Sequence, residues 1–306
     1  QDIISAPDVE SIYQVPLNFE NQNLSAKILQ KLGTKPRTSD LASWKEMVNT
    51  SLTAKKTAKI AMVGKYFSTG DFTLADAYLS VIESIKHAAA RYDIKPKIAW
   101  IDSAQIEEEG VEILKGYDGI VVPGGYGSRA VEGIISSIKF ARENKIPYFG
   151  LCYGMQQAAI EFARNVCGFK DANTTEIDPK SKHPIIHVME SQKDLVKYHK
   201  LGGTQRLGSW EWKAKAGTVF AKSYKSTTGA ERHRHRYEFN NDYRKIFAQK
   251  GMVISATTKD GELVEALELP KHPFFIGVQF HPELKSRPLN PHPLYMAFMD
   301  AVAKQK

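Results

Sequence analysis

One of the two cysteines in the chain lies in a sequence motif that typically places a nucleophilic side chain on an exposed turn. Cys152 is the central residue of the run GLCYG at positions 150–154, a G-x-C-x-G arrangement typical of a strained turn from a strand into a helix. A helix that begins directly after the cysteine would favour its thiolate through the helix dipole. The alternative, a buried thiol that acts as a small apolar side chain, suits Cys167, which has no such turn around it.

A base and a carboxylate that could activate this cysteine occur together near the C-terminus. His281 and Glu283 belong to the run FHPE, which ends a predicted strand over Phe274–Phe280. In extended chain, residues two apart project to the same side, so Glu283 can orient the imidazole while its other nitrogen faces Cys152. By itself FHPE is more often a turn with a solvated carboxylate. Together with the cysteine it predicts a Cys–His–Glu triad for acyl transfer.

Acyl transfer also requires N–H donors for the oxyanion. The run PGGYG at residues 123–127 ends another predicted strand, and we predict the N–H groups of Gly125 and Tyr153 as the donors. Glycine-rich loops also bind phosphates. The pattern G-x-x-x-x-G-K-[ST] is absent, however, because Gly64-Lys65 is followed by Tyr66, and this makes a phosphate loop the weaker interpretation.

Strands that alternate with helices must position these residues. Apolar runs and helical periodicity predict the order strand, helix, strand, strand, helix, strand, helix up to Cys167. The ranges are Lys59–Val63, Thr73–Tyr92, Lys97–Ile101, Gly119–Val122, Ala130–Glu143, Pro147–Leu151 and Tyr153–Cys167. After residue 173 we expect short β segments, at Ile185–Glu190, Thr218–Ser223, Met252–Thr257, Val264–Leu269 and Phe274–Phe280, and then a helix over Pro293–Lys304. This order predicts an α/β fold with a mainly parallel sheet.

The first 50 residues differ from the rest of the chain. They contain predicted helices over Leu24–Leu32 and Leu41–Val48, which are too little to form a core of their own. The polar stretch Ser51–Thr57 is predicted to be a linker. We therefore expect a tail and linker over residues 1–50 and a catalytic domain over residues 51–306.

Composition excludes several classes of protein. Hydrophobic residues make up 42% of the chain, enough for a sizeable core, and no apolar run reaches the roughly 18–20 residues of a membrane span. So few cysteines fit a reducing, cytoplasmic compartment. The net charge of +8 is explained either by a solvated lysine surplus or by ligands that carry phosphates, and without nucleic-acid motifs we favour nucleotides. No histidine cluster has metal-ligand spacing, so no metal site is expected.

The motifs PGGYG, GLCYGMQ and FHPE together resemble the class I (triad) glutamine amidotransferases. Further segments resemble the glutaminase part of the CTP synthase family, namely Ile4–Tyr13, Asn173–Glu176, Leu201–Gly208 and Glu231–Glu238. The resemblance implies a flavodoxin-like, mainly parallel sheet flanked by helices, with added antiparallel β segments in the second half of the chain. It also implies hydrolysis of L-glutamine through a cysteine thioester. It further implies transfer of ammonia to a synthetase domain, which this chain lacks and of which residues 1–50 would be the tail. That domain would aminate UTP to CTP with ATP and Mg²⁺, under activation by GTP, in a homotetramer.

The resemblance also implies the substrate-binding residues. Arg236 would pair with the α-carboxylate of glutamine and Glu176 with its α-ammonium group. The full glutamine-binding set comprises Gly125, Tyr153, Gly154, Met155, Gln156, Glu176 and Arg236, and a lid in the effector region would contain Gly202, Gly203 and Arg206.

Each of these assignments has a plainer alternative. The run RHRHR at residues 232–236 is also an edge strand with its arginines on one face and its histidines on the other, and the lid is also a plain hairpin loop. Two other functions stay open: a different triad amidohydrolase, such as a γ-glutamyl hydrolase, and a catalytically silent regulatory module.

Overall fold

A nine-stranded sheet organises the protein. The computed structural model describes residues 3–35, 40–65, 68–69, 72–73, 78–188 and 205–305. The strand order is β10-β9-β12-β13-β14-β6-β5-β1-β4. The bounds in that order are Thr228–His235, Arg206–Ala214, Val253–Thr258, Val264–Glu268, Phe275–Val278, Tyr148–Leu151, Gly119–Val122, Lys56–Gly64 and Ile94–Asp102.

The sheet has a parallel part and an antiparallel part. The five strands from β14 to β4 pair in parallel, in the flavodoxin-like order, whereas β13, β12, β9 and β10 pair antiparallel. Strands β5 (GIVV) and β6 (YFGL) are buried at every residue, as expected for parallel strands that are covered on both faces. These features confirm the predicted fold class, including the antiparallel additions in the second half.

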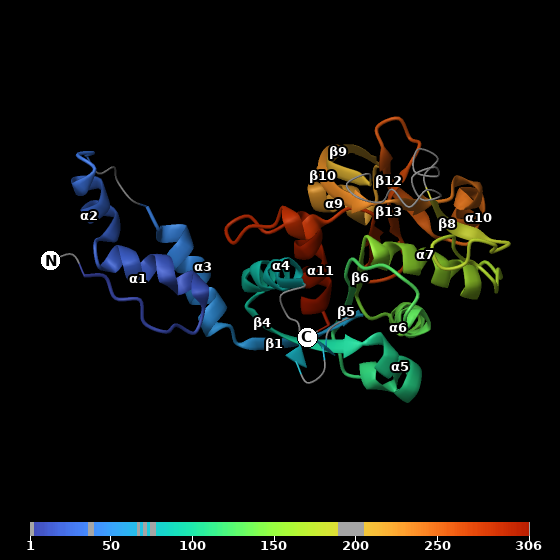
Figure 1. Cartoon of the computed structure of the whole chain (residues 1–306), viewed down its shortest axis with the longest axis horizontal. Coiled ribbons are helices and arrows are strands. Elements are labelled where there is room, and N and C mark those ends of the chain that lie inside the picture. The colour runs from blue at the N-terminus through green and yellow to red at the C-terminus, as the bar shows by residue number, and fades with distance from the viewer. Residues whose placement is uncertain are drawn as a thin grey trace.

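Helices cover both faces of the sheet (Figure 1). Alternate residues of β1 face opposite sides, so Ala61 and Val63 join one core cluster while Ile60 and Met62 join the other. The first cluster includes residues of α5 (Ser103–Glu109), α6 (Val131–Glu143), α7 (Tyr153–Asn165) and α10 (Arg244–Gln249). The second includes residues of α4 (Leu79–Ala89), α9 (Val219–Tyr224) and α11 (Pro293–Ala303). The result is a three-layer α/β/α core.

Two smaller sheets complete the β structure. A three-stranded sheet has the order β11-β8-β7, with bounds Tyr237–Phe239, Pro184–Val188 and Asn173–Thr174. A two-stranded sheet joins β2 (Ser68–Thr69) to β3 (Phe72–Thr73). Strand β11 follows β10 after a single residue, so the chain that leaves the edge of the large sheet enters the small one directly.

The N-terminal residues form helices that lie beside the main body (Figure 1). They comprise η1 (Ile12–Gln14), α1 (Val15–Asn21), α2 (Leu24–Lys31) and α3 (Ala42–Thr53), and the two predicted helices are confirmed. The predicted linker over Ser51–Thr57 is wrong, because α3 continues to Thr53 and β1 begins at Lys56. Met47 and Val48 of α3 are buried, so this helix packs through residues that lie within the predicted range.

One tyrosine connects these N-terminal helices to α4 in the main body of the protein. The hydroxyl of Tyr13 lies 2.5 Å from Glu83 Oε2 and 2.6 Å from His87 Nε2, both on α4. His87 Nδ1 in turn lies 3.2 Å from the hydroxyl of Ser286, in the turn that follows the predicted triad carboxylate. Trp44 Nε1 donates to the backbone oxygen of Tyr13 at 2.7 Å and so helps to hold the Tyr13 backbone in place.

Two predicted elements are wrong in type or extent. Residues 219–224 form α9 rather than a strand, because the Thr218 side chain caps the helix and the Glu268 carboxylate accepts from the N–H groups of Val219 and Phe220. The helix predicted from Thr73 begins at Leu79. In the described part of the chain, no helix has the length and apolar character to cross a membrane.

Candidate active site

Cys152 occupies a strained turn between β6 and α7. Its φ of 50° and ψ of −96° lie in a region that side chains other than glycine rarely adopt. The turn is held because the Cys152 N–H donates to the Val278 oxygen at 2.7 Å while its own oxygen accepts from Gln156 N at 3.2 Å. The sulfur therefore lies at the carboxyl end of β6 and at the N-terminus of α7, which confirms the predicted geometry of the turn.

Glycines on both sides allow this turn to form. A Cβ on Gly154 would lie 2.2 Å from the Val122 oxygen, and a Cβ on Gly150 would lie 2.7 Å from the backbone carbon of Gly154. Both contacts are with backbone atoms that cannot move aside. The turn also receives a hydrogen bond from the Tyr148 hydroxyl to the Gly154 oxygen at 2.9 Å.

His281 and Glu283 follow β14, the strand next to β6. Glu283 Oε1 lies 2.7 Å from His281 Nδ1. The predicted contact therefore forms, but for a different reason: Pro282–Leu284 is a 3₁₀ helix with His281 as its N-cap, and its tight turn brings the carboxylate back to the ring. The backbone N–H of His281 donates to the Arg232 oxygen of β10 at 2.8 Å, so this residue is held from both sides.

The surroundings of His281 favour the charged imidazolium. Burial by itself would lower the pKa of His281, but the negative charges of Cys152 and Glu283, with their hydrogen bonds, raise it well above its ordinary value. An imidazolium beside a sulfur favours the thiolate form, which is the nucleophilic one. Cys167, in contrast, has its thiol pKa raised to about 11 by burial.

The glycine-rich loop after β5 lies directly against the base. A Cβ on Gly124 would lie 2.9 Å from His281 Cε1, so only glycine lets the ring pack there. The next residue, Gly125, lines the same cavity as Cys152. Tyr153 is the first residue of α7, where a backbone N–H has no acceptor within its own helix. Gly125 packs against the Tyr153 ring, where a Cβ would lie 3.5 Å from Tyr153 Cδ1, so the two residues predicted to supply the oxyanion donors are neighbours in the structure.

Side chains from three elements hold the glycine-rich loop at Gly127. Glu176 Oε1 accepts from the Gly127 N–H at 2.9 Å. The Gly127 oxygen accepts from Lys65 Nζ at 2.6 Å and from the Tyr153 hydroxyl at 2.9 Å. Burial lowers the pKa of Lys65 to about 8, an effect that the charges of Glu176 and Glu107 partly oppose.

A cavity of about 820 Å³ contains most of the predicted site residues. This volume lies within the usual range of small-molecule sites. The predicted residues that line it are Gly125, Cys152, Gln156, Glu176, Arg236, His281 and Glu283. The sequence did not single out the other lining residues for the site: Tyr78, Ser80, Val81, Gly124, Tyr126, Gln205, Arg234, His235, Tyr237 and Leu284.

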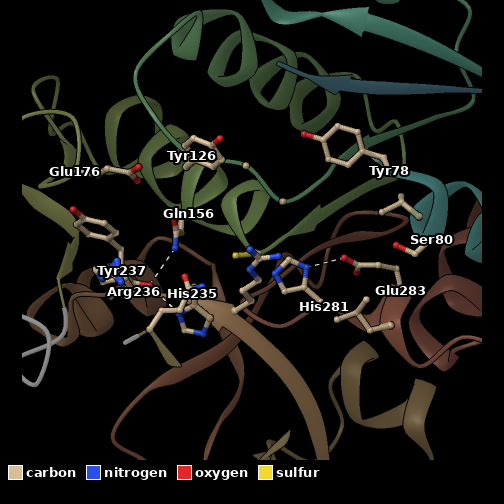
Figure 2. Close-up of a pocket in the computed structure, with 17 residues that line it drawn as sticks. Tyr78, Ser80, Tyr126, Gln156, Glu176, His235, Arg236, Tyr237, His281 and Glu283 are labelled. Atoms are coloured by element: carbon tan, nitrogen blue, oxygen red, sulfur yellow. Dashed lines mark hydrogen bonds and ion pairs between the residues drawn. The ribbon is translucent and has the colours of Figure 1, made fainter. Parts of the chain in front are cut away.

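The two ends of the cavity differ in chemistry (Figure 2). His281 and Glu283 lie at one end, whereas Glu176 and Arg236 lie at the other. Gln156 is 4% exposed, and its Nε2 donates to the Tyr237 oxygen at 3.1 Å. An arginine and a carboxylate at one end suit the carboxylate and ammonium groups of an α-amino acid, whose side chain would then extend toward the cysteine.

Gln279 lies behind the cysteine and was missed by the sequence analysis. Its side chain is fully buried, and its Nε2 lies 3.7 Å from Cys152 Sγ. Its Oε1 accepts from Gln156 Nε2 at 3.4 Å, so the two amides connect the sulfur to the substrate end of the cavity. A polar residue within the apolar run FFIGVQF is the signal that could have identified it.

Three predicted glutamine-binding residues do not line the cavity. Tyr153, Gly154 and Met155 form the first turn of α7, and the Tyr153 hydroxyl bonds to Gly127 instead. Met155 is fully buried and packs against Gly277, where a Cβ would lie 3.0 Å from Met155 Cα. These residues support the turn, and only their backbone groups remain available for the substrate.

The predicted effector region divides into two parts. Gly202 and Gly203 lie outside the described residues. Arg206 is the first residue of β9 rather than part of a lid, and it is 5% exposed. Its guanidinium lies 2.6 Å from Glu265 and 3.4 Å from Glu238, and only such charge pairing makes its burial tolerable.

The histidines of β10 complete this buried cluster. His233 Nδ1 lies 2.8 Å from His235 Nε2, and His233 Nε2 lies 3.2 Å from Glu265. Burial and the charge of Arg206 lower the pKa of both histidines, and burial raises the pKa of Glu265 to about 7. Arg232 and Arg234 are exposed on the opposite face, so the predicted alternation along this edge strand is confirmed.

No metal site is evident in the described ranges, where no three His, Cys, Asp or Glu side chains are close enough together to hold an ion.

Known proteins resemble this chain closely. The family model described as glutamine amidotransferase class-I matches residues 73–301. The CTP synthases of Caldanaerobacter subterraneus and Carboxydothermus hydrogenoformans are each 48% identical, over 305 and 303 residues, and each alignment covers 99% of this chain. The chain spans 55% of the length of each of these enzymes.

A solved structure agrees with these matches. The glutaminase domain of Trypanosoma brucei CTP synthase, with bound acivicin, is 40% identical with a TM-score of 0.73, and the match covers 81% of this chain and 94% of that domain. A putative GMP synthase subunit from Thermoplasma acidophilum, 14% identical with a TM-score of 0.50, shares the fold alone. The chain therefore belongs to the class-I glutamine amidotransferase family, in the group formed by the glutaminase domains of CTP synthases.

Proposed function

We propose that this chain is the glutamine-hydrolysing part of a CTP synthase. The observation that carries the proposal is the position of Cys152: it lies on a strained turn, beside the His281–Glu283 pair, in a cavity whose far end presents Glu176 and Arg236. An enzyme that hydrolyses the side-chain amide of an α-amino acid must bind the α-ammonium and α-carboxylate groups at one end of its cavity while the amide reaches the nucleophile at the other.

The proposed reaction proceeds through a thioester. The Cys152 thiolate attacks the γ-carbonyl carbon of L-glutamine, and the N–H groups of Gly125 and Tyr153 stabilise the resulting oxyanion. The His281 imidazolium protonates the leaving nitrogen, so that ammonia departs and the thioester remains. Neutral His281 then takes a proton from a water molecule as the water oxygen attacks the thioester, which releases glutamate and restores the Cys152 thiolate beside the His281 imidazolium. The sum is glutamine plus water giving glutamate plus ammonia.

The ammonia is proposed to be used elsewhere. A synthetase part would phosphorylate the 4-oxygen of UTP with ATP and Mg²⁺, and ammonia that arrives through an internal channel would replace the phosphate to give CTP. Activation by GTP, assembly as a homotetramer and a cytoplasmic location belong to the same proposal. Residues 1–50 would be the tail of the synthetase part and residues 51–306 the amidotransferase domain. The relatives support the synthetase part of this proposal because they are CTP synthases and this chain aligns with 55% of their length.

The two cysteines provide a matched test of the hydrolytic step. We expect Cys152→Ala to abolish ammonia release from glutamine while Cys167→Ala retains it. A diazoketone analogue of glutamine should add to Cys152 and leave Cys167 unmodified in an intact-mass and peptide-mapping experiment. Glutaminase activity in Cys152→Ala, or an adduct on Cys167 alone, would contradict the proposal. Faster hydrolysis of γ-glutamyl peptides than of glutamine would favour a γ-glutamyl hydrolase.

A further inference from the structure

A buried lysine outside the triad lies under the glycine-rich loop. Lys65 directly follows β1, at the same edge of the sheet as Cys152 and His281, and is 4% exposed. Lysine is almost never fully buried unless its ammonium group is paired. The surroundings of this side chain therefore indicate what the charge stabilises.

The partners of Lys65 lie on the two segments that carry the proposed oxyanion donors. Its Nζ donates to the Gly127 oxygen at 2.6 Å, to the Tyr126 oxygen at 3.4 Å and to the Tyr153 hydroxyl at 2.8 Å. The ammonium also lies 4.6 Å from the centre of the Tyr153 ring. One cation thus connects the loop that carries Gly125 to the first residue of α7.

We propose that Lys65 is a positioning residue for the oxyanion hole, which aligns the N–H groups of Gly125 and Tyr153 without contacting the substrate. This inference rests on the proposed glutaminase reaction. In the Tyr126–Gly127 peptide unit, which directly follows Gly125 in the loop, the carbonyl faces the ammonium and the N–H donates to Glu176, so this unit is held from both sides. The Lys65 contacts at the Tyr126 and Gly127 carbonyls, opposed by Glu176 on the Gly127 N–H, therefore set the orientation of the loop.

The charged and polar groups around Lys65 come from four segments of the chain. Glu176 follows β7, Glu107 lies on α5 and Arg129 precedes α6, while the Tyr153 hydroxyl comes from α7. Burial lowers the pKa of Lys65 to about 8, the two carboxylates act in the opposite direction, and Arg129 lowers it further. The ammonium is therefore lost as the pH rises through about 8, and its hold on the loop carbonyls weakens.

The experiment separates reactions that need an oxyanion hole from one that does not. Acylation of Cys152 by glutamine or by a γ-glutamyl ester passes through a tetrahedral oxyanion. Alkylation by iodoacetamide displaces iodide at a saturated carbon and forms no oxyanion. In Lys65→Met we expect acylation to fall about 10- to 100-fold, less than the roughly 10²- to 10³-fold cost of deleting a donor. The loss should appear in kcat with little change in KM, and alkylation should proceed at the wild-type rate.

The exposed Lys59, on the strand that Lys65 follows, provides the control, and Lys59→Met should match the wild type in both reactions. Equal acylation by Lys65→Met and the wild type would overturn the proposal. So would a parallel loss of acylation and alkylation, which indicates a general disturbance of Cys152. Absence of glutamine hydrolysis by the wild type would instead contradict the proposed function.

Two further measurements decide the matter even where Lys65→Met does not fold. Tyr153→Phe removes only the hydroxyl that Lys65 and Gly127 share, and it should show the same split between acylation and alkylation. In the wild type, the ratio of ester acylation to alkylation should fall as the pH rises through about 8. An ester is used because its leaving group needs no proton from His281. A flat ratio, or no split in Tyr153→Phe, would overturn the proposal.

Discussion

Replacement of Glu283 by glutamine tests whether the carboxylate holds a proton on His281. The amide has the same shape as the carboxylate, and its oxygen can still accept from His281 Nδ1 at the observed 2.7 Å. The variant therefore keeps the orientation of the ring and loses only the negative charge. Because that charge helps to raise the pKa of His281, its loss must lower this pKa.

The size of the effect follows from the contact. A hydrogen bond to a charged group contributes roughly 1.5–3 kcal/mol, and a pKa shift of one unit corresponds to about 1.4 kcal/mol. The negative charge of Glu283 should therefore stabilise the imidazolium by roughly this free energy, and its loss in Glu283→Gln should lower the pKa of His281. At a pH where the wild-type histidine is protonated and the variant histidine is neutral, kcat/KM should be lower by about 10- to 100-fold.

The assay is the pH profile of kcat/KM for glutamine hydrolysis, together with the rate of Cys152 alkylation. The alkaline limb of the kcat/KM profile should move to lower pH in Glu283→Gln. The exposed Glu112 provides a control, and Glu112→Gln should leave the profile unchanged. An alkaline limb at the wild-type position in Glu283→Gln would refute the reasoning, because the carboxylate would then have no influence on the proton of His281.

The same substitution has a signature in stability. A histidine whose pKa is raised in the folded state contributes stability that is fully present below its unfolded pKa, about 6.5, and is lost as the pH rises through the folded value. The free energy of unfolding of Glu283→Gln should therefore fall relative to the wild type at pH 6. The difference should shrink at alkaline pH, as urea titrations at several pH values would measure.

Two further predictions concern stability. Gly154→Ala places a methyl carbon 2.2 Å from the Val122 oxygen, so we expect a loss of at least about 1–3 kcal/mol in the free energy of unfolding, and an unchanged urea midpoint would contradict this account. Arg206→Met leaves two buried carboxylates without their cation, so unfolding at pH 8 should be easier by about 3–5 kcal/mol, whereas Arg232→Met should have little effect. The loss in Arg206→Met should be smaller at pH 5, where the carboxyl groups are protonated, and equal losses at both pH values would argue against an electrostatic origin.

The turn at Cys152 and the parallel strands could be predicted because their signals are local. Two glycines that flank a cysteine at the end of an apolar run specify a close approach of backbone segments, and the structure has that approach at Gly150 and Gly154. Four-residue apolar runs such as GIVV likewise indicate strands covered on both faces, because a helix of that length would bury too little. Such patterns are complete within a few residues.

The features that the sequence did not predict depend on distant partners. Lys65 bonds to residues 61 to 88 positions further along the chain, and Arg206 pairs with carboxylates 32 and 59 positions away. The strand predicted at Thr218–Ser223 is a helix partly because Glu268, some 48 residues later, accepts from its first N–H groups. The residues next to each of these side chains give no sign of its distant partner. Arg206, beside a glycine-rich run, therefore looks like a loop residue, and Lys65, after a strand, looks like an ordinary solvated lysine.

Because the His281 N–H donates to the Arg232 oxygen of β10, a shift of this strand would disturb two parts of the site together. Arg232 begins the run that leads to Arg236, so the segment proposed to bind the amino-acid end of the substrate also holds the backbone of His281, the proposed base. Cys152, in contrast, is supported from the parallel strands through Val278. A displacement of β10 would therefore weaken substrate capture and proton transfer in the same event. Cys152 would keep its position, but the proposed contributions of His281 to proton transfer and of Arg236 to substrate binding would be lost.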